Sequence, residues 1–191
     1  AEIRVAMNPA PGVLFVFAQA GPDTWTPVNK ITPSTGTTGD QFGSSVSFSD
    51  EGLLVGAPGT DGARGGAYFF VNSSGQWTEV LRLDPGAEEN SGAGTAVALT
   101  GDHAFLGAPG GLQDLASFNQ PAPAQPGVVY VFAEDANGGL VLTQRLTGPE
   151  GDGSDRFGSS LLVTEETLFV GAPGRNGSRG VVRRFTRASN E

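Results

Sequence analysis

The segment DQFGSSVSFSDEGLLVGAPG, residues 40–59, decides the fold because the chain repeats it twice. Residues 91–110 read SGAGTAVALTGDHAFLGAPG, and residues 155–174 read DRFGSSLLVTEETLFVGAPG. The three copies start at 40, 91 and 155, and the longer second interval is explained by an insertion between Gly110 and Gly127. A period of about 50 residues indicates a protein built of equivalent units.

Short apolar runs bounded by Gly, Asp, Asn and Ser lie inside and between these copies. Polar and apolar residues alternate in several of the runs, which is typical of half-buried β-strands. In the second unit the runs cover residues 44–48, 53–56, 67–71 and 77–83. Four strands in each repeat of about 50 residues favour a β-propeller blade.

The same register continues to both ends of the sequence. Runs at 3–9, 13–17 and 25–31 would be the last three strands of a first unit, and runs at 159–163, 168–171 and 181–185 the first three of a last unit. The sequence therefore predicts an all-β propeller region of about three and a half blades. Its predicted units cover approximately residues 1–39, 40–90, 91–152 and 153–191.

The two half-motifs, Asp-x-Phe-Gly-x-Ser at 40–45 and 155–160 and the following Gly-Ala-Pro-Gly, resemble the FG-GAP repeat. The third unit departs from the pattern, with Ala93-Gly94 in place of Phe-Gly. We expect the Phe to fill the gap between neighbouring units and the next Gly to let the backbone pass close to its ring. We expect the final Gly of Gly-Ala-Pro-Gly to permit the following turn.

This resemblance implies a seven-bladed propeller of the kind found in integrin α-subunits and in secreted bacterial proteins. An arc of three and a half blades leaves apolar faces open, so we expect a longer propeller or copies that assemble to close a ring. The resemblance also implies an extracellular or cell-surface module that binds a protein or carbohydrate without catalysis. A structural scaffold and, less favoured, a propeller lyase or glycosidase are the alternatives.

The composition excludes several other classes. The chain has no Cys, so it has no disulfide or thiolate chemistry, and its net charge of −9 argues against a nucleic-acid partner. No apolar run approaches the ~18 residues of a membrane helix. The single His, His103, has no nucleophile context, so we interpret it as structural.

The best candidates for ligand contacts lie in the loops after Gly-Ala-Pro. These loops share the form Gly-x-Asp/Asn-Gly-small-Arg-Gly at 59–65 and 174–180, and the Pro-containing insertion occupies the same position in the third unit. Long loops of this kind often carry binding residues. The predicted ligand-binding residues are Asp61, Arg64, Phe118, Asn176 and Arg179.

Cofactors are not expected. The turns between the first and second strands of each unit are too short to surround calcium with six to eight oxygens. Asp152, Ser154 and Asp155 are the only metal candidates, and a solvated turn is the alternative interpretation. Trp25 and Trp77 are interpreted as outer-strand packing, and Asn72 and Asn176 fit the glycosylation sequon.

Overall fold

The computed structural model describes residues 11–110, 126–148 and 154–187. Within these ranges the chain forms antiparallel β-sheets, and the only helical segments there are two four-residue turns. None of the helical segments in the described ranges is long and apolar enough to cross a membrane. The predicted strand at 3–9 and the insertion with Phe118 lie outside the described residues.

Four sheets follow one another along the chain, each an antiparallel meander in sequence order. The first contains β1 (Leu14–Gly21) and β2 (Thr24–Ile31); the second β3 (Ser45–Ser49), β4 (Gly52–Gly56), β5 (Ala67–Ser73) and β6 (Gln76–Leu83); the third β7 (Ala96–Leu99), β8 (His103–Ala108), β9 (Val128–Glu134) and β10 (Leu140–Thr147); the fourth β11 (Ser160–Val163), β12 (Thr167–Ala172) and β13 (Val181–Thr186). The helical turns α1 (Thr60–Ala63) and α2 (Arg175–Ser178) follow β4 and β12. This grouping matches the predicted strands wherever the structure describes them.

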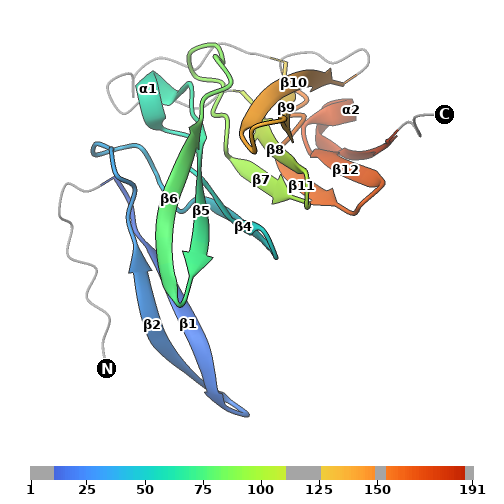
Figure 1. The fold of residues 1–191 in the computed structure, drawn as a ribbon. Coiled ribbons are helices and arrows are strands. Elements are labelled where there is room, and N and C mark those ends of the chain that lie inside the picture. Colours follow the sequence, from blue (N-terminus) through green and yellow to red (C-terminus); the bar gives the residue numbers. More distant parts are fainter. Residues whose placement is uncertain (1–10, 111–125, 149–153, 188–191) are drawn as a thin grey trace.

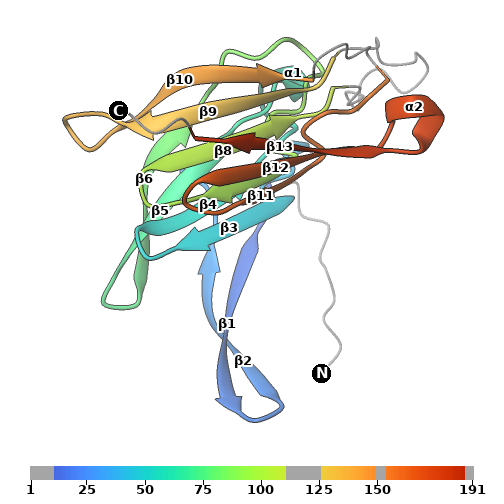
Figure 2. The ribbon, with the colours of Figure 1, turned by 90° about the vertical axis from the view of Figure 1, so that its right-hand side faces the viewer.

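The sheets pack face to face in chain order. Separate apolar cores lie between the first and second sheets, the second and third, and the third and fourth. The first strands β3, β7 and β11 also contact one another in that order. The hairpin β1–β2 projects away from the other sheets, as Figures 1 and 2 show. Each inner sheet thus has a forward face, toward the next sheet, and a backward face, toward the preceding one.

Strand register identifies equivalent positions in different sheets. On backward faces, Phe15 pairs with Lys30, Tyr68 with Arg82 and Tyr130 with Arg145. The guanidinium groups of Arg82 and Arg145 lie 5.9 and 5.4 Å from the centres of their partners' rings. An aromatic residue opposite a cation therefore recurs at one place in three successive sheets, in agreement with a repeated unit.

The Phe of each Phe-Gly motif is a core residue. Phe42 and Phe157 are buried, and the Phe157 ring meets Phe185 edge to face with ring centres 6.0 Å apart. Phe42 packs in the core between the first and second sheets, and Phe157 in the core between the third and fourth. The expected role of these rings in filling the gap between units is confirmed.

The glycines of the motifs are required by close backbone approaches. A Cβ atom on Gly56 would lie 2.0 Å from the Gly94 carbonyl oxygen, and one on Gly107 would lie 2.1 Å from that of Gly158. Gly59 and Gly174 have ordinary φ values of −85° and −78°. The expectation that the final glycine serves the turn conformation is therefore wrong for these two copies, whereas Gly110, the final glycine of the middle copy, has a left-handed φ of 73°. Cβ atoms on Gly59 and Gly174 would lie 1.9 Å from the Gly39 oxygen and 1.8 Å from the Ser154 oxygen, so the Gly-Ala-Pro-Gly turn packs directly on the start of its own repeat.

Candidate binding site

The two predicted binding loops form similar turns. Asp61 and Asn176 are left-handed, with φ of 52° and 54°, and each is followed by a glycine in the same region. Asp-Gly and Asn-Gly tolerate this backbone conformation better than other residue pairs. Both dipeptides therefore form tight turns, one in α1 and one in α2.

The charged groups of α1 are bound within the protein. Asp61 forms an ion pair with Arg82 of β6. Arg64 donates one hydrogen bond to the Glu89 carboxylate at 2.8 Å and another to the Ala87 carbonyl at 3.1 Å. Ala87 and Glu89 belong to the segment that leads into the third sheet. Arg64 therefore connects one repeat to the beginning of the next.

The groups of α2 are differently placed. Asn176 and Arg179 are exposed, and Arg179 makes no ion pair with another described residue. Arg175, which has no charged counterpart in α1, instead donates to the Asp155 carboxylate at 2.5 Å. The structure does not bring Asp61, Arg64, Asn176 and Arg179 into one contact cluster in the described residues. Phe118, the fifth predicted ligand contact, lies outside them.

The candidate metal position is only partly described. Asp155 is buried, and its carboxylate accepts the hydrogen bond from Arg175, while Ser154 is exposed. Asp152 lies outside the described residues. Among the residues that the structure does describe, no cluster of three His, Asp or Glu side chains could hold a metal ion. The corresponding Asp40 accepts hydrogen bonds from the Thr37 amide at 2.7 Å and the Thr37 hydroxyl at 3.0 Å, which hold the start of the repeat in place.

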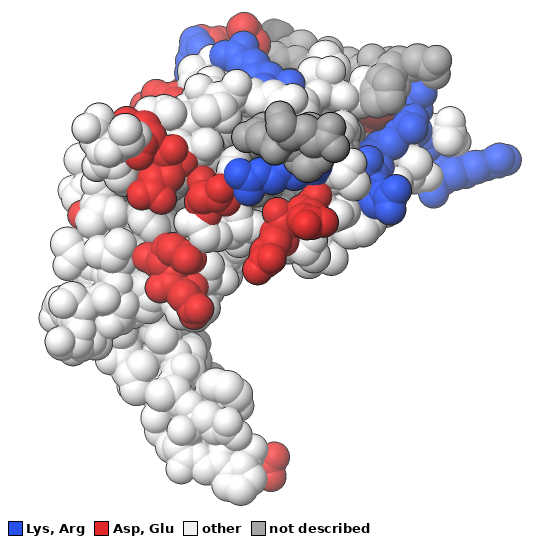
Figure 3. Space-filling model, turned by 45° about the vertical axis from the view of Figure 1, so that its right-hand side comes forward, with Lys and Arg blue, Asp and Glu red and all other residues white. Residues whose placement is uncertain are grey.

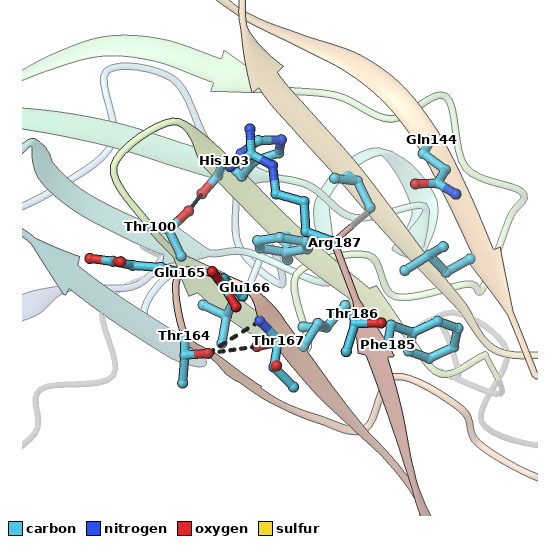
Figure 4. A pocket seen from close by; sticks show the side chains of 15 residues that line it. Thr100, His103, Gln144, Thr164, Glu165, Glu166, Thr167, Phe185, Thr186 and Arg187 are labelled. Carbon is cyan, nitrogen blue, oxygen red and sulfur yellow. Dashed lines mark hydrogen bonds between the residues drawn. The ribbon is translucent and has the colours of Figure 1, made fainter. Parts of the chain in front are cut away.

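A pocket of about 190 Å³ opens between the third and fourth sheets, near the turns that join β7 to β8 and β11 to β12 (Figure 4). Its walls are mainly apolar and aromatic, whereas polar and charged groups surround its mouth. The apolar wall residues are Phe105, Val131, Leu146, Val163, Leu168 and Phe185; the polar residues include Thr100, His103, Gln144, Glu165, Glu166 and Arg187.

The pocket lies where the second and third sheets differ at two equivalent positions. The second sheet has Phe69 and Gly52 there, and the third has Val131 and His103. In the second sheet the Phe69 ring lies over Gly52, 2.7 Å from where a Cβ on that glycine would stand. Register places Val131 where Phe69 stands, because Phe69 pairs with Leu81 and Val131 with Gln144. His103 follows Gly52 by one repeat interval. The smaller valine leaves space that the phenylalanine ring occupies in the preceding unit, a difference that aligning the repeats could have revealed.

His103 is held in place at the edge of this pocket. Its Nδ1 lies 2.7 Å from Oδ1 of Asp102, and Nη2 of Arg187 lies 3.0 Å from the other oxygen of the same carboxylate. The imidazole also stacks on Phe105, with ring centres 6.1 Å apart. These contacts agree with the structural role predicted for His103, and they fix the orientation of a polar ring at the mouth of the pocket.

This cluster predicts a pH effect on stability. Hydrogen bonds from His103 and then from Arg187 hold the pKa of Asp102 below its ordinary value. A carboxyl whose pKa is lower in the folded state adds stability above its unfolded pKa of about 3.9, and this contribution is lost as the pH falls through the folded value. We expect wild type to be more stable than Asp102→Asn at neutral pH and the two to converge in acid. An NMR titration of Asp102 should show its pKa rising in Arg187→Gln; an unchanged pKa would contradict this assignment.

Together the fold and these contacts define an all-β repeat protein whose successive antiparallel sheets are joined through Phe-Gly and Gly-Ala-Pro-Gly segments. Comparison with known families gives the repeat its name. Residues 25–70 match the family model of the FG-GAP repeat, so the chain carries this repeat and the resemblance seen in the sequence is confirmed.

Further comparisons add little about function. A search of curated proteins found no match. Among matching solved structures is a candidate glycoside hydrolase from Parabacteroides distasonis, with 14% sequence identity and a TM-score of 0.36. The alignment covers 91% of this chain and 60% of that one. A similarity of this level carries no argument about activity.

Proposed function

We propose that the four sheets are blades of a β-propeller of the FG-GAP kind, and that this region is a non-catalytic binding module at the cell surface or outside the cell. The observation that carries the binding role is the pocket between the third and fourth sheets. Apolar walls with a few polar groups at the mouth are the usual composition of a ligand site. The FG-GAP repeat supports both the propeller architecture and the extracellular location.

The size and the charge of the pocket suggest what it binds. A volume of about 190 Å³ is below the ~300–1,000 Å³ of drug-sized sites, so the pocket suits one residue of a larger ligand. Glu165 and Glu166 are exposed, and they line the pocket together with His103 and Gln144. A group with an apolar face and hydroxyl or amino groups at its edge fits these walls. We therefore propose a protein or carbohydrate ligand that places one sugar ring or one aliphatic basic side chain here.

The arrangement of carboxylates favours binding over glycoside hydrolysis. Hydrolysis of this kind normally requires two carboxyl groups on opposite sides of the scissile bond. Glu165 and Glu166 are adjacent in one turn, and they are the only carboxylates among the described residues that line the pocket. These observations support the non-catalytic role.

Filling the pocket should abolish binding without unfolding the protein. Val131→Phe copies the residue that occupies the equivalent position in the second sheet, so we expect ligand affinity to fall at least about tenfold, or 1.4 kcal/mol. The measurement is a screen of glycans and basic peptides on wild type, followed by calorimetry of each hit on the variant.

Val141→Phe, on an exposed position of β10 outside the pocket, is the matched control and should bind like wild type. Arg179→Ala should also retain binding, because Arg179 does not line this pocket. Unchanged affinity in Val131→Phe would place the ligand elsewhere. If wild type binds none of the probes, the scaffold role becomes the better account.

A further inference from the structure

The forward face of the fourth sheet is the one forward face in the described residues that no further sheet covers. Register makes Leu162 and Phe169 a pair, equivalent to Ala98 and Phe105 in the third sheet. Val182 stands opposite Gly171, as Val129 stands opposite Gly107. Val129 is fully buried, whereas Leu162 and Val182 are 63% and 67% exposed. We call Leu162, Phe169 and Val182 the C-terminal face.

The close backbone contacts that form at the other sheet boundaries are not made at the C-terminal face among the described residues. Gly65 and Gly127 each have a carbonyl of the next repeat, Ala93 or Phe157, within 2.1 Å of their Cβ position. The equivalent Gly180 meets only Pro173 and Ala172 of its own repeat, at 3.5 Å or more, among the described residues. Open hollows of about 370 and 640 Å³ lie over this face, lined by Leu162, Phe169, Gly171, Gly180 and Val182.

The opposite half of the same interface is exposed on the first sheet. Phe15 and Phe17 are 54% and 46% exposed on the backward side of β1, and their counterparts in β5, Tyr68 and Phe70, are 1% and 2% exposed. Trp25 of β2 is also largely exposed. We call Phe15, Phe17 and Trp25 the hairpin face. The forward half of this sheet interface is therefore exposed on the fourth sheet, and the backward half is exposed on the first sheet.

The charges favour contact between unlike faces. Six of the chain's 11 basic residues lie between 154 and 187, together with three acidic residues, although the whole chain carries −9. Figure 3 shows several basic side chains at the right of the view, others at its top and centre, and a projecting hairpin with little charge. Two C-terminal faces brought together would oppose basic groups, whereas the hairpin segment 14–31 holds only one acidic and one basic residue.

We propose that the C-terminal face of one molecule binds the hairpin face of a second copy, so that the interface formed three times within the chain forms again between chains. The contact is head-to-tail, and such a contact either closes into a ring or continues as an open assembly. Arg179, the counterpart of the Arg64 that joins successive repeats, lies beside Gly180 at the edge of this contact. The inference is independent of the ligand pocket.

Sedimentation velocity on the full chain and on face variants tests this. Wild type should self-associate as its concentration rises. Leu162→Lys/Val182→Lys and Phe15→Lys/Phe17→Lys should each be monomeric, because each lacks one face. An equimolar mixture of the two variants should form a one-to-one complex and nothing larger, because each supplies the face that the other lacks. Val141→Lys, an exposed position in neither face, is the matched control.

Circular dichroism establishes that each variant is folded, and the milder changes Val182→Thr and Trp25→Ser should weaken association in the same direction. Wild type that stays monomeric throughout its soluble range would overturn the proposal. So would face variants that associate like wild type, or two folded variants that fail to combine.

Discussion

Phe157→Ala is expected to lower the free energy of unfolding by about 3–5 kcal/mol, the usual cost of removing a fully buried aromatic ring. The ring is buried between the third and fourth sheets with Phe105, Val129, Val131 and Leu168, and it meets Phe185 edge to face. Removing it leaves a cavity in the core that joins two repeats. Chemical denaturation with an unchanged slope would measure this loss.

Phe48→Ala is the matched control, because it removes the same ring from another copy of the repeat, where the residue is 68% exposed. Its cost should stay below about 1 kcal/mol. Ala93 occupies the motif position in the third repeat and is completely buried, so Ala93→Phe should destabilise by overpacking rather than repair the motif. Equal effects of Phe157→Ala and Phe48→Ala would contradict the role assigned to the motif ring.

Asp155→Ala is expected to cost about 3 kcal/mol, at the lower end of the range for breaking a buried ion pair. The Asp155 side chain is 7% exposed and the Arg175 side chain 17% exposed, and 2.5 Å separates their paired atoms. Removing the carboxylate takes away the negative charge that lies against the guanidinium in a largely buried place. Thermal and denaturant unfolding would measure the loss.

A double-mutant cycle with Arg175→Thr isolates the pair, since threonine is the residue that the second repeat has at this position, Thr60. We expect the two single changes to be strongly non-additive. Additive effects would show that Asp155 acts through other contacts. If Asp155 instead served a cation, a chelator would destabilise both wild type and Arg175→Thr, contrary to the ion pair described here.

The fold follows from the sequence because its signals are local and repeated. Matching intervals between Phe-Gly and Gly-Ala-Pro-Gly predict the strands and their grouping from the sequence alone. The reason for Gly59 and Gly174 could not be read in this way, because it depends on carbonyl groups of Gly39 and Ser154 that approach only after folding. Sequence patterns report backbone preferences more directly than close packing.

The candidate site was less predictable for a similar reason. Arg64 and Arg179 have equivalent places in the sequence, but of the two only Arg64 pairs with a carboxylate, that of Glu89, among the described residues. The pocket arises because the Val131 side chain is smaller than that of the equivalent Phe69. Its other wall belongs to the next sheet, which is distant in the sequence. Neither feature gives a sequence motif, so the sequence predicts binding residues in the loops and does not predict the pocket.

One kind of sheet boundary forms three times among the described residues, and we propose that it forms once more between copies. Hydrogen exchange at low and high protein concentration tests it most directly. We predict that amides in β11, β13 and β1 exchange more slowly at high concentration, while those of the enclosed strand β4 are unchanged. Exchange in β11, β13 and β1 that is the same at both concentrations would contradict the account.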